Sequence, residues 1–371
     1  MKPVIIEGWH FGKEEYEKAH QENKLVKLVT ELSNVCNLSC EGCFTKKVNG
    51  SWNKRTKKRL PDEQDYNTQI ALIDEADSLG IKTVDIVGAG EPTLDHNFER
   101  FINYVLGKEK YVVVFTHGGS SKIVDYATQW KDKNLIFFVK LWSRNSELQN
   151  KYVNSSIEGY AQKRDTILDK LIELEYNSGR ELIVDGIPHQ TTRIGADILV
   201  MKSNYDEIPD LFRFCRRHNI MPEIKTYIPE GPTRFAHEIA SQVYSLEKSE
   251  KLRKEEVTPN DFLKLRKQLE KIDQEEFGIS KLNVVYPQGS KCTQSMGALY
   301  TTIQGDIRSC VGSHMSYGTY IPNRNILKSI LEKRKKNERV GFGCVPRLED
   351  ASLRGIVLDE EIKKIYENEI R

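Results

Sequence analysis

Residues 36–43 read C-N-L-S-C-E-G-C, which places Cys36, Cys40 and Cys43 within eight positions. The segment follows a short β-branched stretch, so we expect the three thiols on a loop just past a strand. Thiolates that converge from a tight loop suit a cubic four-iron cluster, which normally takes four of them; three leave one iron open. Zinc is the competing metal, but its structural sites favour two separated pairs of cysteine or histidine. Free thiols are the third interpretation.

The composition is that of an ordinary globular protein. Charged residues make up 30% of the 371, and 56 basic against 54 acidic residues leave a formal charge of +2. A dedicated nucleic-acid binder normally has a strong basic excess. No stretch approaches the length of a membrane span, and the N-terminal segment has no apolar signal-peptide core. We therefore expect a cytoplasmic protein, in which an odd count of seven cysteines indicates metal chemistry rather than disulfides.

Short β-branched stretches alternate with longer amphipathic ones over the first two thirds of the chain. The expected strands are Leu28–Leu32, Val84–Gly88, Val112–Thr116, Ile136–Leu141, Ala196–Met201 and Glu223–Ile228. The helices expected between them are Asp62–Leu79, Phe98–Leu106, Lys122–Trp130, Tyr160–Tyr176 and Tyr205–His218. Near-continuous apolar strands suit a parallel sheet buried on both faces. The alternation predicts an α/β fold, a partial (β/α)6 TIM-like barrel followed by a small C-terminal α+β domain.

We divide the chain into four segments. Residues 1–25 are expected to be an N-terminal extension, and residues 26–235 the partial barrel. Residues 236–281 follow as a helical linker or cover, with an amphipathic stretch at Pro259–Gly278. Residues 282–371 would form the C-terminal domain, which contains the hairpin signal LYTTIQGDIRSC at 299–310.

The spacing C-x3-C-x2-C, placed after the first strand of a six-fold β/α pattern, resembles the signature of the radical S-adenosylmethionine (SAM) superfamily. The resemblance implies a [4Fe-4S] cluster on Cys36, Cys40 and Cys43, with SAM chelating the open iron. An electron from the cluster would cleave SAM to methionine and a 5′-deoxyadenosyl radical, which takes a hydrogen atom from substrate. The family often has an aromatic residue before the third cysteine; here Gly42 stands there and Phe44 follows the motif. We include Phe44 in the expected SAM site.

The end of the second expected strand resembles the family's Gly-Gly-Glu-Pro motif. It consists of Gly88, Ala89, Gly90, Glu91 and Pro92. Glycines let a backbone approach a ligand closely, because no Cβ intervenes. The resemblance implies that Glu91 and the neighbouring carbonyls accept hydrogen bonds from the methionine ammonium. A plain turn is the alternative.

Two further strand ends offer polar groups to the same site. The segment F-T-H-G-G resembles the family's Thr-Asn-Gly, so Thr116 and His117 could line the SAM site, or simply form a turn. Lys140 stands where relatives often have serine, and it could pair with the SAM carboxylate or a substrate anion. Ser143 could reach the ribose hydroxyls. Otherwise both are ordinary polar residues at a strand end.

The C-terminal cysteines show a second pattern. Cys292 and Cys310 form C-x12-G-x4-C, which resembles the auxiliary-cluster segment of the SPASM and twitch subfamilies. The resemblance implies a second [4Fe-4S] cluster with Cys344 as a further ligand. Its fourth iron would stay open or take another group, such as His314 or Arg347. Alternatively, the three cysteines are small core residues.

The substrate is less well defined by the sequence. Only 35 residues precede Cys36, too few for the N-terminal peptide-recognition domain common in peptide-modifying relatives. We therefore expect a small polar substrate (a sugar, aminocyclitol, nucleotide or metabolite) that undergoes oxidation, rearrangement or epimerisation. A maturase of ribosomally made peptides, a tRNA-modifying enzyme and a non-enzymatic iron–sulfur or zinc protein are the alternatives. The reductant would be a flavodoxin or ferredoxin, and neither a membrane nor nucleic acid is an expected partner.

Other residues are expected near the barrel mouth or in the core. Barrel sites usually form at the carboxyl ends of the strands. Polar residues near these ends are His189, Arg193, Lys225, Tyr227, Arg234 and Tyr300. Cys215 falls on an amphipathic helical pattern beside apolar residues, which indicates a buried core thiol; a hydrogen-atom donor is the alternative.

Overall fold

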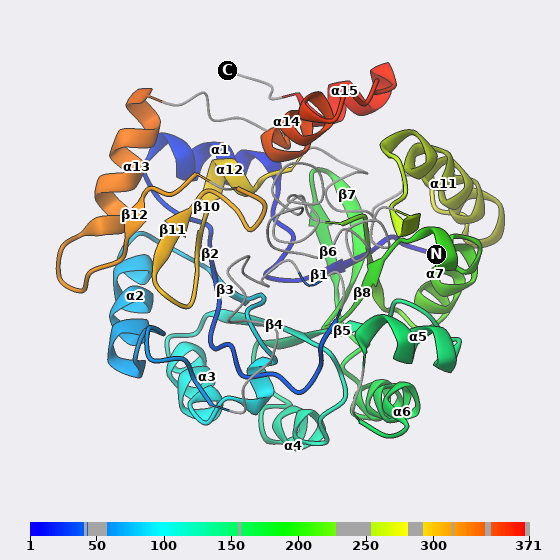
Figure 1. Ribbon diagram of the computed structural model, residues 1–371, viewed down its shortest axis with the longest axis horizontal. Coiled ribbons are helices and arrows are strands. Elements are labelled where there is room, and N and C mark those ends of the chain that lie inside the picture. Colours follow the sequence, from blue (N-terminus) through cyan, green and yellow to red (C-terminus); the bar gives the residue numbers. More distant parts are fainter. Residues whose placement is uncertain are drawn as a thin grey trace.

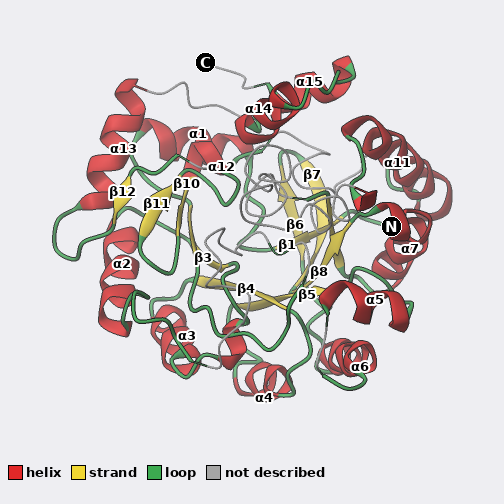
Figure 2. Cartoon of the chain, in the orientation of Figure 1, coloured by secondary structure: helices red, strands yellow, loops and turns green. Residues whose placement is uncertain are grey.

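The computed structural model describes residues 1–40, 43, 58–154, 157–227, 254–280, 292–313, 315–337 and 343–367. They form two β-sheets, with the strands toward the centre and helices around the outside (Figures 1 and 2). In the described part of the chain, no helix is long and apolar enough to cross a membrane.

The larger sheet has nine strands in the order β12-β11-β10-β2-β3-β4-β5-β8-β9. Its parallel core consists of β2 Lys27–Thr30, β3 Thr83–Ile86, β4 Tyr111–Thr116, β5 Leu135–Lys140, β8 Ile194–Leu199 and β9 Met221–Lys225. These are the six predicted strands, displaced by at most three residues at their ends. The largely parallel sheet confirms the predicted α/β class; the partial barrel remains a prediction.

The helices that follow these strands pack on the outer side of the sheet, except α5, which packs beside the cysteine loop (Figure 1). They are α2 Tyr66–Ser78, α3 Phe98–Gly107, α4 Lys122–Gln129, α5 Ser146–Val153, α6 Tyr160–Glu173 and α7 Ile208–Arg217, with short turns η1 Pro92–Leu94 and η2 Lys202–Glu207. In α3, Phe98, Phe101 and Val105 recur at helical spacing and are buried against the sheet. Cys215 of α7 is fully buried in the same core, which confirms the prediction of a core thiol.

The N-terminal residues belong to the interior of the fold. β1 Val4–Ile6 pairs in parallel with β7 Ile187–Thr192, which pairs antiparallel with β6 Glu181–Val184. α1 Lys13–Gln21 follows β1. Between β1 and α1, Trp9 packs against Phe138, with ring centroids 4.8 Å apart, and its Nε1 donates to Asp85 Oδ2 at 3.0 Å. The segment expected as an extension therefore contributes side chains to the sheet interior, and the β6–β7 hairpin is an element that the sequence did not predict.

The C-terminal residues extend the main sheet. β10 Ala298–Thr301 and β11 Asp306–Arg308 form the predicted hairpin, with the turn residue Gly305 at φ +82°. β10 also pairs in parallel with β2, so this segment continues the sheet of the preceding residues. The remaining elements are α12 Gln294–Gly297, β12 Gly318–Thr319, α13 Ile326–Asn337, α14 Val345–Leu353 and α15 Glu360–Tyr366. A separate domain over 282–371 remains a prediction.

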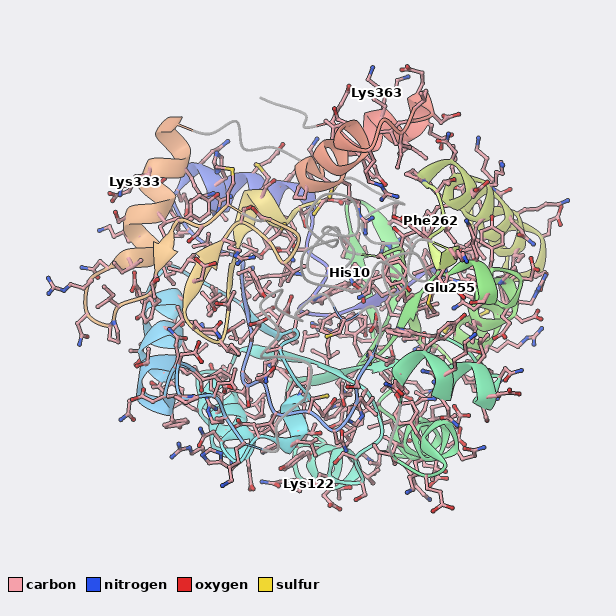
Figure 3. The ribbon with its side chains drawn as sticks, viewed as in Figure 1. His10, Lys122, Glu255, Phe262, Lys333 and Lys363 are labelled. Atoms are coloured by element: carbon pink, nitrogen blue, oxygen red, sulfur yellow. The ribbon has the colours of Figure 1, made fainter. Side chains whose placement is uncertain are left out.

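A helix pair covers α7 on the side away from the sheet. α11 Pro259–Ile272 and the π-helical η3 Asp273–Phe277 match the predicted amphipathic stretch. Arg216 and Asp273, both fully buried, form a two-pronged ion pair at 2.8 and 2.7 Å that joins η3 to α7. Figure 3 labels Phe262, one of the α11 side chains in the main core, and shows Lys122, Lys333 and Lys363 at the periphery.

Candidate active site

A cavity lies at the carboxyl ends of the parallel strands. It encloses about 920 Å³, its open mouth included. Because successive parallel strands end at the same edge of a sheet, the loops after them meet there. The cavity brings together most of the predicted site residues: Cys36, Cys40, Cys43, Gly88, Ala89, Gly90, Glu91, Thr116, His117 and Lys140.

The cysteine loop forms one wall of this cavity. Cys40 is buried, whereas Cys36 and Cys43 are partly exposed. The backbone N–H of Cys43 donates to the Cys40 carbonyl at 3.4 Å, so the last two cysteines lie close together. Leu38 N lies 3.5 Å from Cys36 Sγ. The three thiols therefore face a common space from a tight, irregular segment, as the spacing predicted.

Lys140, the last residue of β5, lies against this wall. Its Nζ is 3.4 Å from Cys40 Sγ and 4.3 Å from the centroid of the Trp142 ring. Burial opposes the charged form, but the neighbouring negative groups, Cys40 first, outweigh burial and raise the pKa of Lys140. The ammonium therefore stays charged beside the thiol sulfur.

The three cysteines offer separate thiols to one cavity. Among the described residues, no group of three His, Cys, Asp or Glu side chains is arranged round one point to hold a metal ion. A single zinc ion needs all of its donors at about 2.0–2.3 Å from one centre. A cubic cluster instead takes each thiolate at a separate iron, and the Lys140 ammonium lies beside one of the three thiols. The three thiols and this ammonium are the observation on which we judge that the residues fit the cluster.

The loop after β3 has an unusual backbone. Gly88 and Ala89 both have positive φ, at +87° and +48°, and the latter is uncommon for a residue with a Cβ. Gly90 faces the cysteine loop, where an added Cβ would lie 2.2 Å from the Val35 carbonyl oxygen. The next N–H, of Glu91, donates to that oxygen at 2.7 Å. The close packing of the two loops therefore requires a glycine at position 90. From the sequence motif alone, the close approach of a ligand was the expected reason for this glycine.

The Glu91 carboxylate joins the loops after β3 and β4. Its Oε1 accepts from Thr93 Oγ1 and Thr116 Oγ1, each at 2.6 Å, and from Thr93 N at 3.3 Å. Its Oε2 accepts from His117 N at 2.7 Å. The side chain is 2% exposed. Protein donors thus fix the carboxylate, and its predicted contact with the methionine ammonium remains a prediction.

His117 connects the β4 loop to the cysteine loop. Its Nδ1 accepts from Gly119 N at 2.8 Å, so the ring proton is on Nε2, which lies 2.8 Å from Asn37 Oδ1. Burial lowers the pKa of His117, although the Glu91 charge opposes this. The neutral ring therefore positions Asn37, one residue past Cys36.

Two predicted SAM-site residues, Ser143 and Pro92, do not line the cavity. Ser143 does not line the cavity, because its Oγ donates to Glu207 Oε2 at 2.6 Å and its backbone N–H to Gln149. Pro92 is buried at the start of η1 rather than in the cavity wall. Phe44 lies outside the described residues.

Some of the residues predicted to contact the substrate line the cavity, and others do not. Lys225 and Tyr227 line the cavity. His189, Arg193 and Tyr300 do not. Arg193 precedes β8 and donates to the Lys131 carbonyl, at the amino end of the sheet. Arg193 therefore lies at the opposite end of β8 from the cavity, which is why it does not line the site.

The other two excluded candidates have their own partners. His189 lies on β7 in the smaller sheet, with Nδ1 2.7 Å from the Ile187 carbonyl. The Tyr300 hydroxyl donates to buried Glu31 at 2.6 Å. Arg234 lies outside the described residues.

Several cavity residues that the sequence pattern did not predict lie on β4 and β8 or just after β5 and β9. They are Phe115, Trp142, Asp197, Leu199 and Thr226. Asp197 could have been found, because a carboxylate inside a strand buried on both faces breaks the apolar pattern. Its Oδ1 lies 2.8 Å from Lys225 Nζ, which lies 3.0 Å from Glu223 Oε2.

The pKa values of this group follow from burial and charge. Burial raises the pKa of Glu223 to about 7, against the pull of Lys225. Burial would lower the pKa of Lys225, but Asp197 and Glu223 outweigh it and raise the pKa instead. The lysine is therefore charged wherever the site operates.

The C-terminal cysteines gather near one another. The Cys292 carbonyl accepts from Gly343 N at 3.0 Å, next to Cys344. Burial raises the pKa of the Cys310 thiol to about 12, and the proximity of Cys344 adds to the rise. Arg347, a suggested fourth ligand, instead donates to Thr226 Oγ1 at 2.8 Å, which joins α14 to the cavity wall. His314, the other suggested ligand, is not among the described residues.

No family model and no curated protein matches the chain. Among solved structures, it is similar to Streptococcus suis SuiB bound to precursor peptide SuiA, with 15% identity, 87% of this chain and 68% of SuiB covered, and a TM-score of 0.57. The structure of SuiB bound to S-adenosylmethionine is 16% identical, with 85% of this chain and 66% of SuiB covered and a TM-score of 0.57. Coproporphyrinogen III oxidase (HemN) from Escherichia coli, described as a radical SAM enzyme, is 13% identical. The match covers 71% of this chain and 56% of HemN, with a TM-score of 0.43. The likeness to SuiB shows a shared fold, and this chain spans about two thirds of the length of SuiB.

Proposed function

We propose that the protein is a radical SAM enzyme that takes a hydrogen atom from a polar substrate. The observation that carries this proposal is the common cavity of Cys36, Cys40 and Cys43 with the Gly88–Glu91 loop, where Lys140 lies against Cys40. The fold shared with SuiB, which was solved with S-adenosylmethionine, supports it.

The roles of the chain's own residues follow from their positions. The three thiols would hold a [4Fe-4S] cluster, which when bound supplies the electron that cleaves SAM. The carbonyls of the Gly88–Glu91 loop would accept hydrogen bonds from the methionine ammonium, and Lys140 would balance the thiolates or bind the carboxylate. Glu91 and His117 hold these loops in place. The apolar wall of Phe115, Leu199 and Tyr227 would limit water.

We further propose a twitch- or SPASM-like role for the C-terminal segment. Cys292, Cys310 and Cys344 would hold a second [4Fe-4S] cluster, and Arg347 would connect that segment to the active-site wall through Thr226. A second cluster suits the acceptance of an electron from a substrate radical, so an oxidation, rearrangement or epimerisation is the proposed outcome. A cytoplasmic flavodoxin or ferredoxin would be the reductant.

A small polar molecule is the first candidate substrate, because the cavity is limited in volume and charged groups are part of its lining. A peptide is the second candidate, since the similar SuiB structure contains a precursor peptide. The formal charge of +2 counts against a tRNA substrate.

Anaerobic reconstitution tests the proposal. About eight irons per chain and 5′-deoxyadenosine formation under reductant are expected, since two clusters would hold four irons each. The matched variant Cys310→Ala should lower the count to about four and leave SAM cleavage intact. Tightly bound zinc with no cleavage would refute the proposal.

A further inference from the structure

A buried carboxylate joins the C-terminal hairpin to the loop after β3. Glu31 directly follows β2 and is 6% exposed. Its Oε1 accepts from the Tyr300 hydroxyl at 2.6 Å, and its Oε2 accepts from the Ile303 N–H at 2.9 Å, both in the β10–β11 hairpin. The backbone N–H of Ala89 donates to the same carboxylate. Glu31 thus receives hydrogen bonds from two segments that are far apart in the chain.

The hairpin also contacts the loop directly. Ala89 and Ile303, each 2% exposed, pack in one small apolar cluster with Leu60. Ala89 has a φ of +48°, which is uncommon for a residue with a Cβ, and it follows Gly88 at +87°. Such conformations persist only where the surroundings hold them. The hairpin and Glu31 supply that support from behind the loop.

One peptide unit connects this support to the cavity. The Ala89 N–H and the Gly88 C=O belong to the same planar peptide, so in its trans form they point in opposite directions. Glu31 does not line the cavity, whereas Gly88 and Ala89 do. Glu31 therefore takes the N–H on the side away from the cavity and leaves the carbonyl on the cavity side. Within the described residues, the Gly88 carbonyl accepts no backbone hydrogen bond.

We propose that Glu31 is a positioning residue that directs the Gly88 carbonyl toward the methionine ammonium of SAM. The inference rests on the proposed function, because it takes the Gly88–Glu91 loop to be the SAM loop. It extends that function to the C-terminal hairpin, which supports the SAM site although none of its described residues lines the cavity.

The direction of this carbonyl matters for affinity. A hydrogen bond from an ammonium to a carbonyl is charge-assisted and about twice as strong as a neutral one. Hydrogen bonds weaken steeply as their angle departs from linear. A rotated Gly88–Ala89 peptide would therefore lower the affinity for the amino acid part of SAM and leave the adenosine part unaffected.

Two ligands that differ in the amino acid part test the proposal. SAM and 5′-methylthioadenosine, which has neither the ammonium nor the carboxylate, are compared by equilibrium dialysis with the anaerobically reconstituted chain. The variant is Glu31→Gln, in which an NH2 group replaces one acceptor oxygen. The control is Asp273→Asn, which removes another buried carboxylate, at the contact of η3 with Arg216 of α7.

We expect Glu31→Gln to bind SAM about tenfold more weakly and 5′-methylthioadenosine with unchanged affinity. Asp273→Asn should leave both affinities unchanged per folded protein. Equal SAM affinity in Glu31→Gln and wild type would overturn the proposal. An equal loss for both ligands would also overturn it, because the side chain would then support the cavity as a whole.

Tyr300→Phe decides the matter if Glu31→Gln does not fold. This variant keeps the buried ring and removes one donor to Glu31. SAM affinity should fall about threefold, with no change for 5′-methylthioadenosine. Unchanged SAM affinity, or the same loss for both ligands, would then refute the role of Glu31.

The two proposals fail separately. A protein that prefers SAM to 5′-methylthioadenosine but never cleaves it would keep the role of Glu31 and lose the radical chemistry. SAM cleavage together with a preference that Glu31→Gln retains would remove only the role of Glu31.

Discussion

Lys140 Nζ lies 3.4 Å from Cys40 Sγ, at the point where β5 ends beside the cysteine loop. Two elements separated by 100 positions in the chain thus bring a buried ammonium to a thiol. A cation in this place would balance the charge of an anionic metal centre bound nearby. The contact is the most direct structural support for a metal role of the cysteines.

Replacement of Lys140 by methionine tests this contact. Lys140→Met keeps the length of the side chain and removes its charge, so reconstituted iron should fall and SAM should bind about tenfold more weakly, the scale of one charge-assisted hydrogen bond. Iron analysis and equilibrium dialysis measure both. The control is Lys122→Met, at an exposed position on α4. Unchanged iron and SAM binding in Lys140→Met would contradict the role.

A pair of glycine variants tests the packing of the two loops. In Gly90→Ala the new Cβ would meet the Val35 carbonyl at 2.2 Å, so we expect a loss of about 1–3 kcal/mol in unfolding free energy. Gly107→Ala on α3 meets nothing within 4 Å and should be neutral or slightly stabilising. Urea unfolding measures both. Equal stabilities would show that the loops separate easily.

The Glu91 carboxylate is tested by Glu91→Gln. One acceptor oxygen becomes an amide NH2, which leaves the His117 N–H or the threonine hydroxyls without a partner. An unsatisfied buried donor costs about 1–3 kcal/mol, so unfolding free energy should fall by that amount. Glu99→Gln, at an exposed position on α3, is the control. If both variants unfold at the same urea concentration, the carboxylate does not hold the loops together.

The pH dependence of stability follows from Asp85. Burial raises its pKa from 3.8 to about 6, against the opposing charge of Lys27. A carboxyl whose pKa is raised by folding contributes stability that is complete below about pH 3.8 and is lost as the pH rises through about 6. Asp85→Asn stays neutral at every pH and can still accept from Trp9.

The stability of Asp85→Asn relative to wild type should therefore improve by about 3 kcal/mol between pH 4 and pH 7, the equivalent of two pKa units. Urea unfolding at both values measures the difference, with Asp132→Asn at an exposed position as the control. A difference that is the same at both pH values would show that Asp85 titrates normally.

The local pattern of the sequence was sufficient for much of the fold. The six strands have continuous apolar stretches, and the hairpin has a glycine turn at Gly305, so each could be identified from its own residues. The pairing of β10 with β2 and the place of Trp9 inside the sheet could not. Both depend on contacts between segments far apart in the chain, which no local pattern records.

In the candidate site, too, some features follow from the local sequence and others depend on contacts between distant segments. Cys36, Cys40 and Cys43 lie within eight positions of the sequence, so their closeness in space could be expected from their spacing. Asp197 and Lys225 acquire their meaning only from the register of β8 against β9. The hydrogen bond from the Ser143 hydroxyl to Glu207, a partner 64 positions away, could not be predicted from the local pattern.

The central claim is that the thiols in the cavity, rather than cysteine in general, support SAM cleavage. It is tested most directly by the 5′-deoxyadenosine formed under reductant by Cys40→Ala and by Cys215→Ala, both reconstituted anaerobically. Cys215 is the matched control, because it is fully buried on α7 and does not line the cavity. We predict no product from Cys40→Ala and wild-type amounts per folded protein from Cys215→Ala. Product from Cys40→Ala at the wild-type rate would contradict the account.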